Sequence, residues 1–276
     1  MSKIGIIAGG GKLPAMLIQA CEQQNKPYFV IAFDGHTDPE TVTDKPHSWE
    51  RLGAAGKTIK ILKSEGVTDI VMAGAIRRPS MWELRPDMKT TALFAKLGTK
   101  MLGDDGLLRA ISNVLEDEGL RIVGAHEVLP DLLTPLGCIT NKKPNKTNQE
   151  DIQSGCKIAK NIGQMDIGQA CVMQAGFVLG VEAVEGTKNL IAGCGEHKRK
   201  GEKPVLIKVK KPQQDSRLDM PAIGSETIEQ IAEAGFAGIA VEAGGTMIID
   251  RDDMIKTANK HKVFVIGVDP KEMILQ

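Results

Sequence analysis

The sequence predicts an α/β fold of two domains, an amino-terminal one built on a parallel sheet and a distinct carboxyl-terminal α/β one. In both halves, short apolar runs alternate with apolar residues at helical spacing, which is the order of parallel strands joined by helices. Between the halves, residues 134–148 are polar and turn-rich without apolar periodicity, which is typical of a linker. We therefore expect domains at residues 1–133 and 149–276.

The amino-terminal half begins with a strand, a glycine loop and a helix. Residues 3–8 are apolar, Gly9, Gly10 and Gly11 follow, and the next apolar residues fall at helical spacing with Pro14 in the first turn. Glycines at such a junction let the backbone approach a ligand and leave amides aimed at it. Because the spacing matches neither the dinucleotide nor the Walker pattern, a phosphate site and a plain tight turn both remain open.

Further elements alternate through the rest of this half. Ligands bind at the carboxyl ends of parallel strands, so Arg77 and Arg78, which follow the third strand, are candidate anion contacts. The alternative is that they are surface arginines that bridge helices. We expect strands at 27–33, 69–76 and 120–125 and helices at 49–62, around 93–97 and at 107–115, with Gly66 and Gly119 as helix ends.

The carboxyl-terminal half repeats the alternation. Asn148 with Asp151 resembles a capping box that opens a helix, and Ser225 is the expected N-cap of another. Residues 169–183 form a long β-rich apolar run that Gly176 and Gly180 break. We expect further strands at 205–211, 237–242, 246–249 and 263–268 and helices at 225–234 and 251–260.

A basic strand runs into an acidic loop within this half. Apolar and basic residues alternate, so Lys208 and Lys210 share one face of a half-buried strand, which Lys211 closes. Asp215 and Asp219 follow, and then the start of a helix. Phosphoryl chemistry needs cations, carboxylates that hold a metal or activate water, and free amides. The alternative is a solvated strand whose aspartates merely form turns.

The charge balance limits the classes of partner. Thirty-five basic and 35 acidic side chains give a formal net charge of zero, whereas a general nucleic-acid binder needs a basic excess. Aromatic residues make up only 3% of the chain, which leaves few stacking platforms for single strands. Both observations argue against nucleic acid as a partner.

The cysteines and apolar runs indicate the compartment. Five cysteines stand at long, unrelated spacings without a C-x-x-C pair, which indicates neither a zinc site nor a disulfide framework and fits a reducing cytoplasm. No run of eighteen apolar residues occurs, and the amino-terminal apolar run is too short for a signal peptide. We expect a cytoplasmic protein that does not span a membrane, although an apolar surface groove could still contact one.

Four stretches, in the same order along the chain, resemble one known family. They are residues 4–14, 182–187, 211–224 and 238–244, and they look like the metal-dependent UDP-2,3-diacylglucosamine pyrophosphatases of lipid A biosynthesis. The resemblance implies a Rossmann-like amino-terminal domain and a distinct carboxyl-terminal domain, with the lipid substrate in a cleft between them. It also implies hydrolysis of UDP-2,3-diacylglucosamine to UMP and 2,3-diacylglucosamine 1-phosphate, or lipid X.

The same resemblance implies a cofactor, a location and an assembly. Magnesium, or another divalent cation such as manganese, would assist a water directed at the phosphorus on the sugar side. The enzyme would meet its substrate by peripheral contact with the cytoplasmic face of the inner membrane. It would form a homodimer.

The resemblance also assigns site residues. Asp219 takes the place of the aspartate in the family's Asp-x-Pro motif, and we expect it to be a metal ligand or a water-orienting base. Asp215 and Arg217 take the places of an acidic residue and the arginine that follows it. We add Lys211 as a phosphate contact, because Pro212 fixes the backbone beside it. Substrate contacts are expected from Gly9, Gly10, Gly11, Arg77, Glu185, Gly186, Thr187, Lys208, Gln214, Arg217, Gly224 and Glu242.

One departure from the family pattern bears on activity. After Thr187 the family usually has an aspartate, whereas this chain has Lys188. If that aspartate supports the metal, the metal affinity or the activity is altered here. The alternative function is therefore a non-catalytic lipid or nucleotide-sugar binding protein on the same fold. A dehydrogenase is disfavoured, because the dinucleotide fingerprint is missing.

Overall fold

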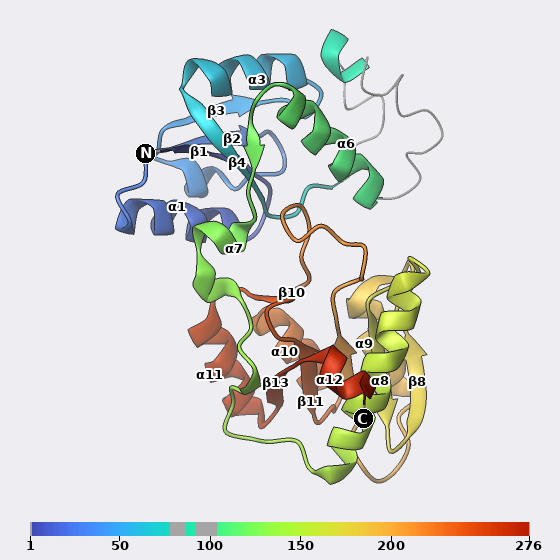
Figure 1. The fold of residues 1–276 in the computed structure, drawn as a ribbon. Coiled ribbons are helices and arrows are strands. Elements are labelled where there is room, and N and C mark those ends of the chain that lie inside the picture. The colour runs from blue at the N-terminus through green and yellow to red at the C-terminus, as the bar shows by residue number, and fades with distance from the viewer. Residues whose placement is uncertain (1, 78–86, 92–103, 276) are drawn as a thin grey trace. The chain divides into compact units, whose positions relative to one another are not determined.

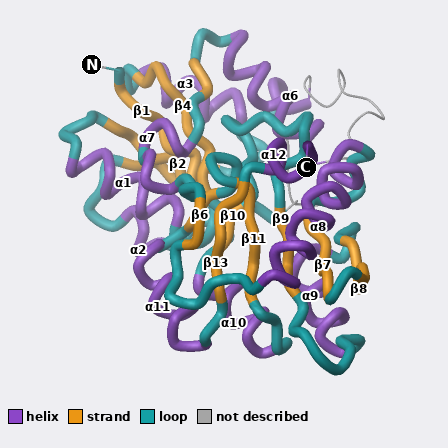
Figure 2. Tube along the Cα trace, turned by 60° about the horizontal axis from the view of Figure 1, so that its bottom comes forward, coloured by secondary structure: helices purple, strands orange, loops and turns teal. Residues whose placement is uncertain are grey.

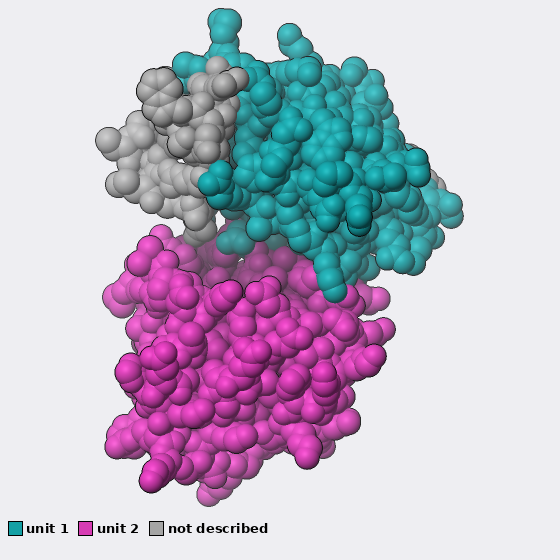
Figure 3. Space-filling view, turned by 180° about the vertical axis from the view of Figure 1, so that it is seen from behind, with its two compact units in different colours: residues 1–130, 216–219 teal, residues 131–215, 220–276 magenta. Residues whose placement is uncertain are grey.

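The computed structural model describes residues 2–77, 87–91 and 104–275. These residues fall into two compact units (Figure 3). Unit 1 comprises Met1–Pro130 and Ser216–Asp219, and unit 2 comprises Asp131–Asp215 and Met220–Gln276. Arg78 and the helix expected around 93–97 lie outside the described residues.

Unit 1 is built on a five-stranded parallel sheet in the order β3-β2-β1-β4-β5. The order reverses at β1, whose neighbours β2 and β4 lie on opposite sides of it, so β1 forms a topological switch point. This sheet confirms the predicted fold class of the amino-terminal half. Its strands are β1 (Lys3–Ala8), β2 (Tyr28–Phe33), β3 (His47–Glu50), β4 (Val67–Ala73) and β5 (Arg121–Ile122).

Helices cover both faces of this sheet (Figure 1). Ile59 and Leu62 of α3 and Leu115 of α6 pack with β2 and β4 in one buried cluster, while α1 and α7 lie on the other face. Gly66 and Gly119 have φ angles of 71° and 82° and end α3 and α6 as predicted. The helices are α1 (Leu13–Gln23), α2 (Pro39–Val42), α3 (Ala55–Ser64), α6 (Asp104–Asp117) and α7 (Ala125–Val128).

The helix predicted at 49–62 is wrong in its first turn. Trp49 belongs to β3 and pairs with Ala32 of β2, and the helix begins only at Ala55. An aromatic residue fits a pleated surface beside another strand, and pairing with β2 decides the conformation that the local apolar spacing left ambiguous.

Unit 2 contains a six-stranded mixed sheet in the order β6-β13-β11-β9-β7-β8. The central strands β9, β11 and β13 are parallel, whereas β6, β7 and β8 run antiparallel to their neighbours. The strands are β6 (Gly137–Cys138), β7 (Ala170–Gln174), β8 (Phe177–Val181), β9 (Val205–Lys208), β11 (Gly238–Glu242) and β13 (Phe264–Val268). A second sheet pairs β10 (Ala222–Ile223) with β12 (Met247–Ile248).

Helices also cover both faces of the larger sheet in unit 2. Leu206 packs on the side of α9, α10 and α11, while Val205 and Ile207 pack under α8. Figure 2 shows α8 running beside β7 and β8. The helices are α8 (Lys146–Gln164), α9 (Gly186–Glu196), α10 (Ser225–Glu233), α11 (Arg251–His261) and α12 (Pro270–Leu275), with a 3₁₀ turn at Pro130–Leu132.

The basic strand is more deeply buried than the sequence predicted. All four residues of β9 are buried, and the strand ends at Lys208 rather than Lys211. The prediction of a half-buried strand is therefore wrong. Both faces of β9 carry helices, so it has no solvated side.

The predicted capping box of α8 is also wrong. Asn145, not Asn148, is the N-cap, and its Oδ1 accepts a 2.8 Å hydrogen bond from the Asn148 amide. Asp151 instead accepts the amides of Ala175 and Gly176 at 2.8 and 2.7 Å, in the turn between β7 and β8. That turn splits the apolar run at 169–183 into a hairpin.

The stretch at 134–148 contributes ordered structure to unit 2. It contains β6, which pairs with β13, and the first residues of α8. Unit 1 ends slightly earlier along the chain, at Pro130. Among the described residues, no helix is both long and apolar enough to cross a bilayer.

Candidate functional site

The parallel strands of unit 2 end at one edge of the sheet. We call this edge, with Lys208 at the end of β9, Val209 and Lys210 after it, and Glu242 at the end of β11, the carboxyl edge. Ligands of α/β sheets bind outside such an edge. Four of the predicted site residues lie on it or on the adjoining start of α9: Gly186, Thr187, Lys208 and Glu242.

Lys208 lies in a buried row of polar side chains. Its exposed fraction is 9%, and its ammonium donates a 3.2 Å hydrogen bond to the Thr187 hydroxyl. That hydroxyl donates to Oε1 of Glu182, which is 6% exposed and whose Oε2 accepts the Gln169 amide at 3.0 Å. The carboxylate therefore compensates a cation that burial would otherwise disfavour.

Thr187 belongs to the first turn of α9, so the Lys208 ammonium lies beside a helix amino terminus. Gly186 begins this helix with a φ of 76°, a conformation that a residue with a side chain rarely adopts. Glu185 is exposed and accepts the Ala183 amide at 3.0 Å, which closes the preceding turn. A cation and a helix amino terminus at one edge form an environment that attracts anions.

Sequence reasoning did not select Glu182 as a site residue. An acidic residue directly after the apolar strand β8 was the available signal, because a carboxylate in such a position needs a partner. The partner is the hydroxyl of Thr187, five residues further along the chain.

Glu242 holds the chain as it leaves β9. Its Oε2 accepts the Lys160 ammonium and the Lys210 amide, both at 2.8 Å, and Lys160 also donates to the Lys210 carbonyl at 2.9 Å. Lys160 comes from α8 and was not among the predicted site residues. The three groups fix the backbone direction just after Lys208.

The segment after β9 is tied to the end of α8. Lys211 forms a 2.7 Å ion pair with Asp166, and the Gln214 amide donates to the Lys211 carbonyl at 3.1 Å. Gln213 donates from its side chain to the Gly163 carbonyl at 2.8 Å, and Gln214 is 7% exposed. The predicted phosphate contact Lys211 therefore has a carboxylate partner in this structure.

Asp219 belongs to a short segment that is part of unit 1, although the sequence on both sides of it belongs to unit 2. Residues 216–219 are counted with unit 1, where Arg217 donates to Glu116 at 3.0 Å and Leu218 packs against the cluster of β2, β4, α3 and α6. Asp219 is exposed at the end of this segment. Asp215 is the last residue of unit 2 before it.

The glycine loop of unit 1 is explained largely by close contact with the chain after β4. The Gly9 amide donates to the Ala73 carbonyl at 2.7 Å, and the Gly10 amide donates to the Ala75 carbonyl at 2.8 Å. A Cβ on Gly9 would lie 2.6 Å from the Ala75 carbonyl oxygen. Gly11 is exposed with a φ of 87°, and it is the one glycine of the three whose amide has no hydrogen-bond partner among the described residues.

The two remaining predicted contacts lie at other points of the fold. Arg77 is exposed and follows Ala75 at the carboxyl end of the unit 1 sheet. Gly224 is the N-cap of α10, and its carbonyl accepts the Ile228 amide at 3.2 Å. The prediction of Ser225 as this cap is wrong by one residue.

The cysteines do not resemble nucleophiles. Burial raises the pKa of the Cys156 and Cys171 thiols to about 12, so both remain protonated at neutral pH. All five cysteines are free thiols. Within the described ranges, no three His, Cys, Asp or Glu side chains gather as metal ligands.

Comparisons with known proteins cover the whole chain. Residues 3–132 match the family model of the LpxI N-terminal domain, and residues 135–266 match that of the LpxI C-terminal domain. The UDP-2,3-diacylglucosamine pyrophosphatase LpxI of Caulobacter vibrioides is 37% identical over 282 residues, which cover 99% of each chain.

Two solved structures that resemble the chain do so only weakly. Bordetella bronchiseptica WbmG in complex with NAD and UDP gives a TM-score of 0.32 at 16% identity, over 98% of this chain and 75% of that one. The biotin carboxylase domain of Hydrogenobacter thermophilus 2-oxoglutarate carboxylase gives 0.27 at 12% identity, over 64% and 36%. Scores this low carry no argument about fold or function.

Proposed function

The chain belongs to the LpxI family, and from this membership we propose that it hydrolyses the diphosphate bond of UDP-2,3-diacylglucosamine to UMP and 2,3-diacylglucosamine 1-phosphate. The observation that carries the proposal is the match of both family domains in order, together with a pyrophosphatase 37% identical over 99% of the chain. The resemblance of the Asp219 motif and the Glu185 to Thr187 turn points the same way.

The geometry of the carboxyl edge supports a phosphate site there. Hydrolysis of a diphosphate increases the negative charge on phosphate oxygens, and a fixed ammonium in a partly dry site stabilises that charge more than water does. Lys208 is such an ammonium, held by Thr187, whose hydroxyl donates in turn to the buried Glu182. We assign Lys208 and the start of α9 to the substrate diphosphate.

A divalent cation fits the donor set at Asp219. Mg²⁺ is commonly held by one or two carboxylates together with substrate phosphates, so it needs no cluster of three protein ligands. An exposed carboxylate such as Asp219 offers the hard oxygen that Mg²⁺ or Mn²⁺ prefers. The cation would neutralise charge on the diphosphate, and Asp219 would hold it or orient the attacking water.

Peripheral membrane contact at the cytoplasmic face and a homodimer remain part of the proposal. The acyl chains of the substrate belong to a bilayer, so the enzyme must work at its surface. The outermost strand of the unit 2 sheet, β8, exposes Phe177, Val178 and Val181 at 56%, 48% and 39%. An apolar edge strand can contact a membrane or a second copy of the chain. Vesicle flotation tests the membrane contact, and sedimentation velocity tests the homodimer.

The deciding experiment is release of UMP from UDP-2,3-diacylglucosamine by the purified protein with magnesium. We expect release that stops when the metal is chelated. A protein that binds the substrate yet releases no UMP above the chelated control would instead be the non-catalytic binding protein, the outcome that Lys188 in place of the family's aspartate would explain.

A further inference from the structure

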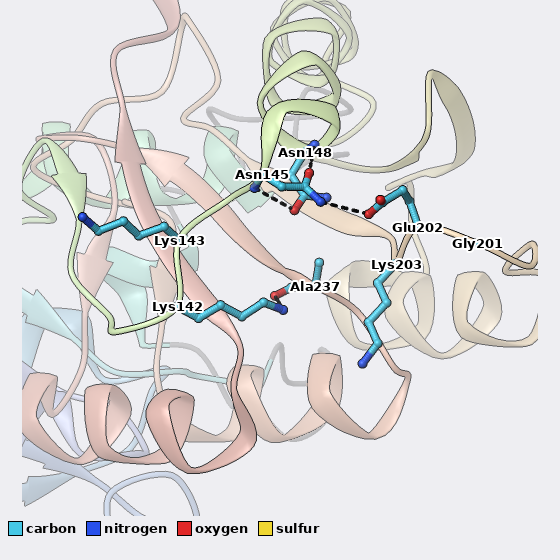
Figure 4. A pocket seen from close by; sticks show the side chains of 8 residues that line it. All are labelled: Lys142, Lys143, Asn145, Asn148, Gly201, Glu202, Lys203 and Ala237. Carbon is cyan, nitrogen blue, oxygen red and sulfur yellow. Dashed lines mark hydrogen bonds between the residues drawn. The ribbon is translucent and has the colours of Figure 1, made fainter.

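A cavity of about 240 Å³ lies at the amino ends of the unit 2 strands (Figure 4). Lys203 precedes β9, and Ala237 precedes β11, so both strands start beside the cavity. Asn145 and Asn148 line it from the first turn of α8, a helix of 19 residues. The cavity lies beside the first residue of β11, Gly238, and Glu242 is the last. The four residues of rise between them span about 13 Å at the usual rise of a strand. The cavity is thus distinct from the carboxyl edge.

Three lysines line the cavity against one carboxylate. Lys142, Lys143 and Lys203 line it together with Glu202, whose Oε2 accepts the side-chain amide of Asn145 at 3.1 Å. The Lys143 side chain points away from Glu202 (Figure 4). Lys142 donates one hydrogen bond, at 3.0 Å, to the Ala237 carbonyl. Across the described ranges, the ammonium groups of Lys143 and Lys203 have no ion-pair partner. The formal charge of the lining is therefore positive.

The Lys142 ammonium is held at an electrostatic cost. Burial, and next the neighbouring charge of Lys203, lower the pKa of Lys142, and Glu202 only partly opposes this. An anion between the two lysines would reverse the repulsion, because an opposite charge favours the protonated form.

Asn148 supplies a donor that the protein leaves unused. The residue is 3% exposed, and its Oδ1 accepts the Asn145 amide at 3.3 Å, which fixes which end of the side chain carries the nitrogen. Its Nδ2 has no hydrogen-bond partner among the described residues, although a buried donor normally has one. Figure 4 shows Asn148 beside Asn145 on the cavity wall, at the amino terminus of α8.

We propose that this cavity is a second anion site, which binds a phosphate group between Lys142, Lys203 and Asn148 at the amino terminus of α8. The buried amide donor, the two ammonium groups and the positive end of a long helix are the groups that recognise phosphate oxygens. The phosphate can belong to a soluble ion or to the headgroup of an acidic lipid, since both present the same oxygens.

The test measures binding of inorganic pyrophosphate to the full chain by calorimetry. We expect Lys142→Gln and Lys203→Gln each to weaken binding at this site about tenfold or more, because each removes a charge-assisted hydrogen bond. Lys157→Gln, on the exposed face of α8, removes the same charge outside the cavity and is the matched control. Equal weakening in all three variants would mean nonspecific attraction and would overturn the proposal.

Asn148→Asp separates binding from folding. A carboxylate can still accept the Asn145 amide and suits the first turn of a helix, but it repels phosphate and lacks the Nδ2 donor, and its burial at a position 3% exposed costs some stability. We expect this variant to remain folded, with a somewhat lower melting temperature, and to bind no pyrophosphate at the site. Pyrophosphate affinity equal to wild type would exclude Asn148 and with it the site.

Nuclear magnetic resonance and vesicles provide the remaining readouts. Pyrophosphate should raise the pKa of Lys142 in the wild type, and a pKa that does not move would contradict the proposal. Binding to phosphatidic acid vesicles that pyrophosphate displaces, beside none to phosphatidylcholine vesicles, would identify a lipid headgroup. Binding of pyrophosphate without vesicle binding would identify a soluble anion. None of these measurements depends on UMP release, and each is made in a Lys208→Met background, which keeps pyrophosphate binding at the carboxyl edge out of the signal.

Discussion

A single buried lysine carries much of the electrostatic argument at the residue scale. Lys208 is held by Thr187, which is in turn held by Glu182, so the ammonium is fixed before any substrate arrives. The sequence assigned the phosphate contact to Lys211 instead, and that ammonium pairs with Asp166. The two assignments lead to different kinetics.

We expect Lys208→Met to lower kcat/KM about a hundredfold, the usual cost of removing one preorganised donor to a developing charge. Lys210→Met and Lys211→Met should cost much less, and UMP release at saturating magnesium compares the three. Melting temperatures show whether the loss reflects folding. A loss confined to Lys211→Met would restore the sequence assignment. Equal small losses that vanish at high salt would mean general attraction of an anionic substrate.

Asp219 gives the second prediction at this scale. We expect Asp219→Ala to lower kcat by orders of magnitude while substrate affinity stays nearly unchanged, because a metal ligand or base acts mainly in the transition state. Asp117→Ala removes another exposed carboxylate of unit 1 and should keep full activity. The assignment fails if Asp219→Ala turns over at a rate near wild type.

Some of these residues were predictable from the sequence and others were not. The turn at Gly186 and Thr187 and the edge position of Lys208 follow from local patterns and from strand ends. Lys160 becomes visible only in three dimensions, because its partner Glu242 comes from another element. The position of Glu182 directly after β8 indicated a buried carboxylate, but not that Thr187 is its partner. A single sequence records the residue types at a site but not the hydrogen bonds that connect distant ones.

At the scale of elements, α8 depends on its N-cap. Asn145→Ala removes the 2.8 Å bond to the Asn148 amide and should lower the free energy of unfolding by about 1 kcal/mol. Asn145→Ser keeps a side-chain acceptor and should lie close to wild type. Denaturant titration of the two variants checks this, and equal stability of Asn145→Ala and wild type would exclude the capping role.

Glu118 connects α3 and α6 with residues 88–91 and gives unit 1 a dependence on pH. Hydrogen bonds from Lys63 and then Lys89 lower the pKa of Glu118 from 4.5 to about 2. A depressed carboxyl pKa contributes stability that is complete above the unfolded value and is lost as pH falls toward the folded one.

We therefore expect Glu118→Gln to lose less stability than wild type when the pH falls from 4.5 to 2, as measured by urea unfolding at each pH. Asp117→Asn, on the neighbouring residue, should follow wild type. Salt should shrink the difference, since the pairs are partly exposed. Parallel curves for Glu118→Gln and wild type in low salt would contradict the assignment.

Strand and helix order was readable from the sequence wherever an element is long and regular. Strands β1, β2 and β4 and the end of α3 at Gly66 follow from apolar runs and a glycine. Short elements were missed or displaced, such as β3 at Trp49 and the two-residue β6, because pairing with a neighbouring strand decides them. The turn of the hairpin of β7 and β8 lies at Ala175 and Gly176, with φ angles of 48° and 83°, and only the glycine marked a break in the apolar run.

At the scale of the whole molecule, the chain passes between the two units at three points. Unit 1 takes residues 216–219 from the middle of the unit 2 sequence, so the chain changes unit after Pro130, Asp215 and Asp219. Leu218 anchors the segment in the cluster of β2, β4, α3 and α6. The position of Asp219 within unit 1 thus depends on the packing of its neighbour.

We expect Leu218→Ala to cost about 1–2 kcal/mol, less than a fully buried leucine, and to lower kcat about tenfold or more through displacement of Asp219. Leu136→Ala, at a side chain 67% exposed, should change neither quantity. Thermal unfolding and UMP release measure the two effects. A Leu218→Ala protein with wild-type kcat would show that the anchor does not position the carboxylate.

Residues 216–219, which belong to unit 1 but lie within the unit 2 sequence, also constrain how such proteins can recombine. A crossover between two relatives after residue 132 and before residue 135 leaves the sequence of both family domains intact. It would nevertheless join Arg217 and Leu218 from one parent to Glu116 and the hydrophobic cluster from the other. The chimera would therefore carry mismatched contact residues directly beside Asp219. The two halves are therefore expected to share one ancestry, even though each folds around its own sheet.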